Sequence, residues 1–352
     1  MPEDSYPLRT ILGYYASRPG IQIGTGMSSA LPEDDARFAR QLGVEWVMTG
    51  VGEADEHSAA NYRKVRERFE RAGLKVYRLG HPGCHNMPDI TLNLPGRDAK
   101  LEEYLTYIRN LGAAGIHYST YAHMANSVWG TDTETIRGGA VSRAFHLEQV
   151  RAGGEPWGAL THGRVYSDDE LWDNYIYFIR RVVPVAEESG VYIGIHPDDP
   201  PLYPLGGVPR PIFGTFEGYK RAIEIADSSN IGVCLCVGCW LEGGKAMGKD
   251  VVDTIRYFGG MGKLFKVHLR NITAPMPEGF AETFLDDGYQ DMWQVIRALQ
   301  DIGYDGAVIS DHLPQMVGGH KVAEAHAVGY MRGLIQAVEN ESRAGKDLRS
   351  GR

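Results

Sequence analysis

Four side chains that could bind a metal ion stand near the ends of four successive apolar segments in the second half of the chain. His196 ends "YIGIH", Cys236 ends "IGVCLC", His268 lies in "KVHLRN" and Asp311 lies in "VISDH". Neutral imidazole, thiolate and carboxylate are common ligands of divalent transition metals. Each residue alone also fits an ordinary role, such as a hydrogen-bonded core histidine or a small apolar cysteine. Their recurrence at four neighbouring segment ends predicts a metal site.

The segment "VCLCVGCW", residues 233–240, holds three of the four cysteines of the chain. Because side chains alternate faces along a strand, an inward Cys236 implies an inward Cys234, and Cys239 falls beyond the strand in the loop. A structural zinc site made from all three is an alternative, but two of the sulfurs share one strand and no second cysteine pair exists elsewhere. We therefore expect Cys236 to be the ligand and Cys234 to pack one layer below it.

Further polar and aromatic residues lie where a substrate would meet this metal. Asp311 and His312 are the candidate catalytic pair, with His312 as general acid or base unless the strand turns it the other way. Arg270 shares the inward face of its segment with the histidine ligand and could bind a carboxylate, or else pair with Asp198 or Asp199. The remaining candidates for substrate contact lie in loops at the same end of the strands: Arg210, His85, Tyr121, Trp129 and Asp198.

The elements that must position these residues show as short apolar segments alternating with longer amphipathic ones. Candidate strands are residues 21–28, 44–51, 74–81, 115–122, 191–197, 231–238, 264–271 and 306–312. Helical patterns separate them, for example over 59–72, 98–112, 168–189, 215–227, 287–302 and 321–339. Eight strand–helix units predict an α/β protein with a single (β/α)8 TIM barrel. A doubly wound sheet is the alternative, but it needs fewer strands and a GxGxxG segment that the chain lacks.

The barrel is expected over about residues 20–341 of a single domain that spans 1–352. A long insert after the fourth strand, residues 123–167, is rich in Gly, Thr and Ser and is a candidate lid over the barrel mouth. Residues 342–352 are expected to form a polar C-terminal tail. In such barrels the catalytic residues lie at the carboxyl ends of the strands, which is where the candidates above are found.

The overall composition narrows the class of partner. The net charge of -9, with acidic and basic residues mixed along the chain, makes nucleic acid an unexpected partner. No run is apolar enough for a membrane span, and the opening "MPEDSYPLRT" lacks a signal core. Four cysteines do not make a disulfide framework, so a cytoplasmic location is expected. A small molecule is the expected partner, and we predict a homo-oligomer.

Several segments resemble the D-mannonate dehydratase family over about residues 70–340. They are "LNLPGRDAKLEEYLTYIRNLGAAGI", a stretch with Tyr121, Met124 and Trp129, "IGIHPDDPP", "LCVGC", "DTIRYFGGMGKLFKVHLRN" and "ALQDIGYDGAVISDH". The resemblance implies a xylose-isomerase-like barrel with bound Mn²⁺ or Fe²⁺. It also implies loss of water from a sugar acid such as D-mannonate, giving 2-keto-3-deoxy-D-gluconate. The metal ligands of the family fall on His196, Cys236, His268 and Asp311.

The chain departs from the family pattern in three places. Its N-terminal region differs, and the segment after "DH" lacks the Gly-Arg and the Tyr-bearing loop of the family. The loop after the seventh strand also lacks a histidine near Thr283–Asp286. We therefore expect a retained metal site with altered substrate recognition and proton transfer, for which His320 and Asp287 are substitute candidates.

Two other hypotheses stay open at this point. A metal-dependent sugar isomerase or epimerase of the same barrel type would surround its metal with carboxylates and a histidine, without a thiolate. A non-catalytic paralogue that binds a sugar acid would keep the metal site but lose the missing loop.

Overall fold

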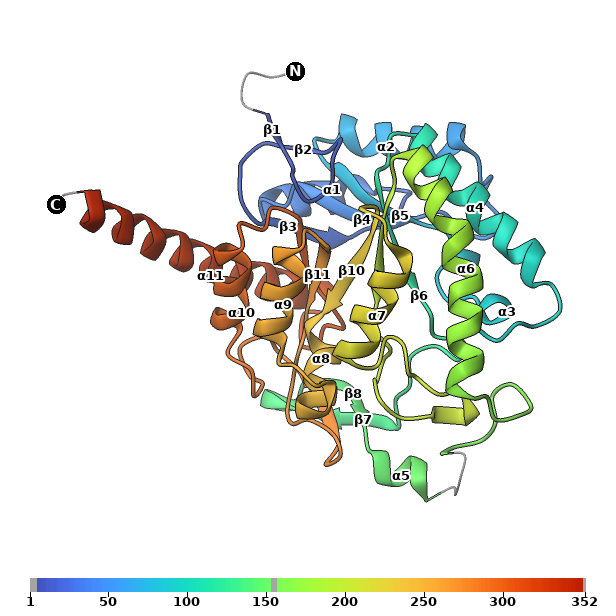
Figure 1. The fold of residues 1–352 in the computed structure, drawn as a ribbon. Coiled ribbons are helices and arrows are strands. Elements are labelled where there is room, and N and C mark those ends of the chain that lie inside the picture. Colours follow the sequence, from blue (N-terminus) through green and yellow to red (C-terminus); the bar gives the residue numbers. More distant parts are fainter. Residues whose placement is uncertain (1–4, 153–156, 351–352) are drawn as a thin grey trace.

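The computed structural model describes residues 5–152 and 157–350, with side chains described as far as residue 344 (Figure 1). Eight parallel strands form its central sheet, and all eight predicted strands are confirmed. They are β3 (Gln22–Gly26), β4 (Trp46–Gly50), β5 (Lys75–Gly80), β6 (Tyr118–Ala122), β9 (Tyr192–His196), β10 (Ile231–Cys236), β11 (Leu264–Leu269) and β14 (Ala307–Ser310).

The strands form a nearly closed barrel. Their hydrogen-bonded order is β5-β4-β3-β14-β11-β10-β9-β6. A parallel bridge between Asn86 and Ala122 then connects the segment after β5 to β6, the strand at the other end of that order. The predicted (β/α)8 barrel is therefore confirmed, while its extent as one domain over the whole chain stays a prediction.

Helices surround the barrel, because each amphipathic helix buries its apolar side against the strands. The predicted helical patterns correspond to α2 (Ala59–Arg71), α4 (Arg97–Ala113), α6 (Asp168–Ser189), α7 (Phe216–Ala226), α10 (Met292–Asp301) and α11 (His320–Ser350). Further helices are α1 (Glu33–Gln41), α3 (Pro88–Thr91), α8 (Val237–Gly243) and α9 (Val251–Gly260). The segment expected as a tail from residue 342 continues α11 as far as Ser350, and its red end projects from the barrel (Figure 1). No helix of the described chain is both long and apolar enough to cross a membrane.

A short hairpin closes the amino-terminal end of the barrel. It consists of β1 (Tyr6–Pro7) and β2 (Tyr15–Ala16), which pair in an antiparallel manner. Tyr14 in this segment packs on Trp46 inside the barrel and donates a hydrogen bond to the carbonyl of Tyr77 at 2.8 Å. Apolar and aromatic side chains therefore fill this end.

The long insert lies at the opposite end, by the carboxyl ends of the strands (Figure 1). It contains the hairpin β7 (Asp132–Thr135) and β8 (Val141–Phe145), followed by α5 (Leu147–Arg151). Two strands from the loop after β11 extend this hairpin into a small antiparallel sheet: β12 (Asn271–Ile272) and β13 (Phe280–Thr283). Residues 153–156 of the predicted insert lie outside the described residues. The insert thus packs against the loop of a distant strand, a contact that the sequence pattern did not predict.

Candidate active site

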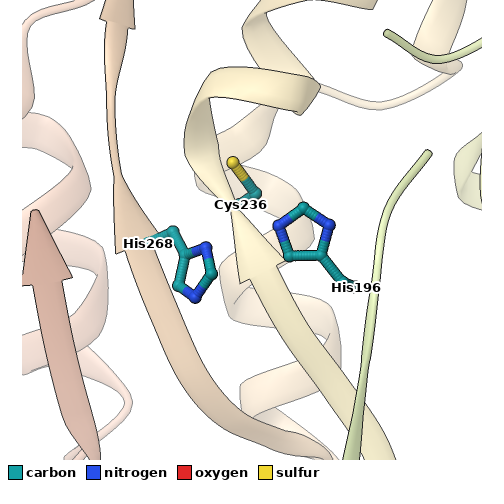
Figure 2. A group of neighbouring side chains, drawn as sticks. All are labelled: His196, Cys236 and His268. Atoms are coloured by element: carbon teal, nitrogen blue, oxygen red, sulfur yellow. The ribbon is translucent and has the colours of Figure 1, made fainter. Parts of the chain in front are cut away.

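Three predicted ligands lie together at the ends of adjacent strands (Figure 2). His196 is the last residue of β9, Cys236 is the last residue of β10, and His268 lies beside Cys236 on β11. Potential ligand atoms of these three residues lie within 4.8 Å of one another. Asp311 directly follows β14, and its Oδ2 lies 3.5 Å from Sγ of Cys236. The structure thus brings all four predicted ligands to one place.

The tautomer of His196 suits a metal ligand. Its Nδ1 lies 2.7 Å from the carbonyl oxygen of Pro197, a distance at which the ring N–H donates to that oxygen. The proton on Nδ1 leaves Nε2 with a free lone pair, and an oriented outer-shell hydrogen bond of this kind is typical of metal-bound histidine. Burial lowers the pKa of His196, but the sulfur of Cys236 outweighs burial and raises it.

His268 offers an unpaired nitrogen to the same place. Its Nε2 lies 3.5 Å from Sγ of Cys234, which sits one layer below Cys236 in β10. Its Nδ1 is buried and has no hydrogen-bond partner within the described residues, with the nearest carboxylate oxygen, from Asp311, 3.6 Å away. A buried nitrogen without a partner, beside a sulfur and a carboxylate, fits the donor set of a divalent transition metal.

The surroundings of Cys236 favour its thiolate. Burial raises the pKa of this thiol, but a hydrogen bond with the side chain of Cys239 and the charge of Arg270 outweigh burial and hold the pKa well below its ordinary value. Cys236 also forms the N-terminal cap of α8, where its sulfur accepts from Cys239 N at 3.5 Å. Since the thiolate is the form that binds metals, this environment suits a ligand.

A second cluster of possible ligands, on the outer side of the barrel, fits a metal poorly. His81, Cys84 and Glu103 lie within 4.8 Å of one another. However, Nδ1 of His81 accepts a hydrogen bond from Gly83 N at 3.1 Å, which puts the ring proton on the nitrogen that would have to bind metal. The ammonium of Lys100 also lies 2.7 Å from Glu103 and already neutralises it. We therefore do not assign a metal to this cluster.

A third cluster is already neutralised by arginines. Asp199, Cys239 and Glu242 lie close together and are fully buried. Nη2 of Arg270 lies 3.0 Å from Asp199 and 2.9 Å from Glu242, and Nη2 of Arg143 lies 2.7 and 2.9 Å from the same two residues. These two guanidinium groups occupy the positions beside the carboxyl groups that a metal ion would take. Burial, followed by the charge of Asp199, raises the pKa of Glu242 well above its ordinary value, while Arg270 and Arg143 act in the opposite direction.

Arg270 is engaged by the protein itself. Besides Asp199 and Glu242, its Nη1 donates to Oε1 of Glu282 at 2.7 Å, and its side chain is fully buried. The ion pair that we considered as an alternative is therefore the observed arrangement. Only Nη1 and Nη2 of Arg270 are engaged in these pairs, and its buried Nε has no hydrogen-bond partner within the described residues. Binding of a substrate carboxylate by Arg270 stays a prediction.

His312 faces the site. β14 ends at Ser310, so strand alternation no longer fixes the direction of this side chain, and the backbone of His312 turns with φ of 46°. Its Nδ1 lies 2.7 Å from Oε1 of Glu282. Burial lowers the pKa of His312, but the carboxylates of Asp311 and Glu282 outweigh burial and raise it. The side chain is 36% exposed, and its Nε2 lies 3.9 Å from Oδ1 of Asp311.

Arg210 and Asp198 lie beside this site in buried positions. Nη1 of Arg210 donates to the carbonyl of Pro200 at 2.6 Å, and Nη2 donates to Oδ1 of Asn126 at 3.2 Å. Arg210 thus joins the loop after β9 to the start of the insert, so its predicted contact with substrate is not supported. Burial raises the pKa of Asp198 to about 6, with the charge of Arg210 acting in the opposite direction.

The three residues with ring side chains that were predicted to contact the substrate lie in different environments. The side chain of Tyr121 is fully buried between Tyr104 and Phe178, behind the barrel wall, so it is a core residue and the predicted contact with substrate is not supported. Trp129 is partly buried in the insert, where its backbone N–H donates to the backbone carbonyl of Asp199 at 3.1 Å. His85 stays close to the site: burial, followed by the charges of Arg78 and His196, lowers its pKa to about 3.

Three residues of the buried ionic cluster were not found from the sequence. Arg143, Glu242 and Glu282 each stand as a single charge in a largely apolar segment: "VSRAF", "CWLEG" and "GFAETF". An isolated charge in an apolar run is a weak signal, because an edge strand with one solvated residue looks the same. Only the contact between the insert and the loop after β11 brings them together.

The chain is similar to one family across its second half and to several proteins over most of its length. The family model for D-mannonate dehydratase (UxuA) matches residues 158–345. A mannonate dehydratase from Thermotoga neapolitana is 33% identical over an alignment of 314 positions that covers 78% of this chain and 84% of that protein.

Two solved structures are similar to this chain in fold. The crystal structure of mannonate dehydratase from Streptococcus suis serotype 2 superposes with a TM-score of 0.79 at 28% identity, covering 92% of this chain and 96% of that chain. A xylose isomerase domain protein from Planctomyces limnophilus has a TM-score of 0.61 at 14% identity, covering 92% of this chain and 99% of that chain. At this low identity, the similarity to the xylose isomerase domain protein supports only the xylose-isomerase-like fold.

Proposed function

The chain belongs to the D-mannonate dehydratase family and is a sugar-acid hydro-lyase, and from this premise we propose that it converts D-mannonate to 2-keto-3-deoxy-D-gluconate. The observation that carries the proposal is the meeting of His196, Cys236, His268 and Asp311 at four adjacent strand ends. We propose these four as ligands of a divalent metal ion.

The chemistry of the ligands supports Mn²⁺ or Fe²⁺ as the ion. Two imidazoles, one thiolate and one carboxylate form a mixed nitrogen, sulfur and oxygen set that suits first-row transition metals better than Mg²⁺ or Ca²⁺. The thiolate of Cys236 also distinguishes the site from the carboxylate-rich metal sites expected of a sugar isomerase or epimerase. The dehydratase hypothesis is accordingly favoured over that alternative and over a non-catalytic paralogue.

The reaction removes a proton from C2 of the sugar acid and the hydroxyl group from C3, which leaves with a proton as water. The resulting enol then takes up a proton at C3 and becomes the 2-keto acid. When bound, the metal ion stabilises the negative charge that develops at the carboxylate and its neighbouring hydroxyl. His312 is proposed to transfer one of the two protons through Nε2, since Glu282 and Nη1 of Arg270 both contact Nδ1. These contacts hold the ring in place.

Two finer expectations remain part of the proposal. The acidic net charge of -9 supports a small molecule rather than nucleic acid as partner. The homo-oligomer predicted from the sequence stays a prediction, and analytical ultracentrifugation of the purified chain tests it.

A panel assay tests the proposed function. Purified protein loaded with Mn²⁺ or with Fe²⁺ is incubated with a set of aldonic acids that differ in configuration at C2 and C3, and 2-keto-3-deoxy acids are measured. We expect product from D-mannonate with either metal and none after chelation. A ketose or an epimer without any 2-keto acid, or no turnover of any aldonate, would contradict the proposal.

A further inference from the structure

The two arginines expected to bind a substrate carboxylate are both taken up by the protein. Arg270 is surrounded by carboxylates of the chain, and Arg210 donates to loop carbonyls and an amide. A sugar acid is an anion at neutral pH, and a buried carboxylate needs charge-assisted hydrogen bonds to offset its lost hydration. Besides the proposed metal ion, the substrate carboxylate therefore needs a cationic side chain that has no partner of its own.

Arg78 faces the interior of the barrel because of an irregularity in β5. Val47 of β4 pairs with Val76, but the next residue of β4, Met48, pairs with Arg78, so Tyr77 is an extra residue in β5. Such a bulge turns two consecutive side chains to one face of a sheet. Tyr77 packs inside the barrel, and so does Met48, which lies beside Arg78. The bulge thus points Arg78 inward, where strict alternation would have turned it toward the helices.

The guanidinium extends toward the mouth. It lies over Gly80, the last residue of β5: a Cβ on this glycine would be 3.1 Å from Nη2 and 3.2 Å from Nη1 of Arg78. Any larger residue at this position would push the guanidinium away. Gly80 therefore makes room for Arg78 at the carboxyl end of the strand, the end where the candidate metal ligands lie.

Arg78 has no partner within the described residues. Its Nε is buried without a hydrogen bond, no ion pair is formed with it, and the side chain is only half-buried. By contrast, the buried Arg143 and Arg270 each contact several carboxylates. Burying a guanidinium without an anionic partner is unfavourable in free energy. The inward position of Arg78 is therefore explained if an anionic ligand binds to it.

The carboxyl end of β5 lies beside a proposed metal ligand. Asn86, in the segment after β5, bridges to Ala122, and Ala122 is the residue of β6 that pairs with His196. In keeping with this arrangement, burial, followed by the charges of Arg78 and His196, lowers the pKa of His85, which directly precedes Asn86.

Lys266 is buried on β11 two residues before His268 and forms no ion pair within the described chain. The barrel interior below the candidate ligands thus holds two basic side chains, Arg78 and Lys266.

We propose that Arg78 binds the carboxylate of the sugar-acid substrate and thereby selects acids over neutral sugars. The inference rests on the proposed function for the identity of the ligand. A planar guanidinium meets a carboxylate through two parallel hydrogen bonds, which Lys266 cannot reproduce. Binding here orients the sugar chain toward the strand ends that carry the metal ligands and His312.

The test compares Arg78→Met and Arg78→Lys with the wild-type chain and with Arg109→Met, which removes an exposed arginine of α4 paired with Glu102. Each protein is checked for thermal midpoint and bound metal, then for kcat, KM and calorimetric binding of D-mannonate and of its neutral amide. We expect Arg78→Met to raise KM and Kd for D-mannonate about 100-fold, the loss of two charge-assisted hydrogen bonds. Arg78→Lys should lose about 10-fold, and Arg109→Met should match the wild type.

Further binding and stability results decide the inference. Binding of the neutral amide should be the same in Arg78→Met and in the wild type, and the thermal midpoint should not fall, because no partner is lost. A KM and a Kd for D-mannonate within threefold of the wild type would overturn the inference, whereas a lower midpoint with lost metal would show a structural role and also overturn it. If the wild type turns over no aldonate, the proposed function fails, but the calorimetric comparison still tests Arg78. Arg78→Lys allows the same test if Arg78→Met does not fold.

Discussion

Nδ1 of His312 lies 2.7 Å from Oε1 of Glu282, although 30 positions separate the two residues in the chain. Glu282 is part of β13, in the loop after β11, and His312 follows the last barrel strand. The same carboxylate oxygen accepts from Nη1 of Arg270, also at 2.7 Å. Glu282 therefore fixes the ring plane of His312 from one side and is itself fixed from the other, which makes it a positioning residue for the proposed proton transfer.

Glu282→Gln tests this relationship. Glutamine keeps the shape and an acceptor oxygen but loses the negative charge that holds both His312 and Arg270. We expect kcat to fall about 10- to 100-fold, with bound metal and KM for D-mannonate near wild-type values. Steady-state kinetics and metal analysis measure this, with Glu278→Gln, an exposed residue of the same loop, as the control. An unchanged kcat in Glu282→Gln, or an equal loss in both variants, would refute the positioning role.

Cys236→Ser tests the metal site. Serine keeps a small polar side chain but replaces a soft thiolate by a hydroxyl that stays protonated at neutral pH. We expect metal affinity to fall by more than the 10- to 100-fold typical of a lost outer-shell partner, and activity to fall with it. Elemental analysis after dialysis measures the metal, and Cys84→Ser, a buried cysteine of the outer cluster, is the control. Full metal content in Cys236→Ser would remove Cys236 from the proposed ligand set.

The strand ends were predictable because short apolar strand segments alternate with longer amphipathic helical segments along the chain. Apolar segments ending in a polar residue placed His196, Cys236 and Asp311 at one end of a barrel, since parallel strands of such a barrel share one direction. The sequence could not predict which candidates face the mouth. Tyr121 lies on a strand end too, yet its ring packs into the core behind the wall.

Other features depend on contacts between distant segments. The pairing of Arg270 with Asp199 is decided by the loops that bury both, and loop packing has no periodic signal. Arg78 points inward because Tyr77 is an extra residue in β5. A sequence-based prediction assumes strict alternation of side chains along a strand, so it does not include such a bulge. The sequence thus predicted the positions at the strand ends but not how their charges are balanced.

Arg143→Met tests the buried ionic cluster. Nη2 of Arg143 lies 2.7 Å from Asp199 and 2.8 Å from Glu282, and it links the insert to the barrel. Loss of one cation leaves buried carboxylates without a full counter-charge, so we expect a loss of about 3–5 kcal/mol in the free energy of unfolding.

Urea unfolding measures this loss, and Arg137→Met in the same insert is the matched control. Arg137 forms an exposed pair with Asp286 at 2.8 Å, for which about 0–1 kcal/mol is expected. Equal losses in the two variants would show that burial of the cluster around Arg143 adds no stability.

His123 should make the fold sensitive to acid. It is buried in the core with Nε2 unpaired, and burial lowers its pKa from 6.5 to about 3. Above pH 6.5 the imidazole is neutral in both the folded and the unfolded chain and has no effect on the pH dependence of stability. As the pH falls from 6.5 toward 3, the unfolded chain takes up a proton that the folded chain does not. The free energy of unfolding should therefore fall by about 1.4 kcal/mol for each pH unit from this residue.

His123→Asn isolates this effect, because asparagine keeps an acceptor for the hydroxyl of Tyr121 but does not titrate. Urea unfolding at pH 7, 6, 5 and 4 should show a shallower loss of stability in the variant than in the wild type, although cavity formation lowers its stability at pH 7. His162→Asn, which removes a partly exposed imidazole of the insert, is the control variant. Equal slopes in His123→Asn and in the wild type would mean that His123 gains its proton in the folded chain as readily as in the unfolded one.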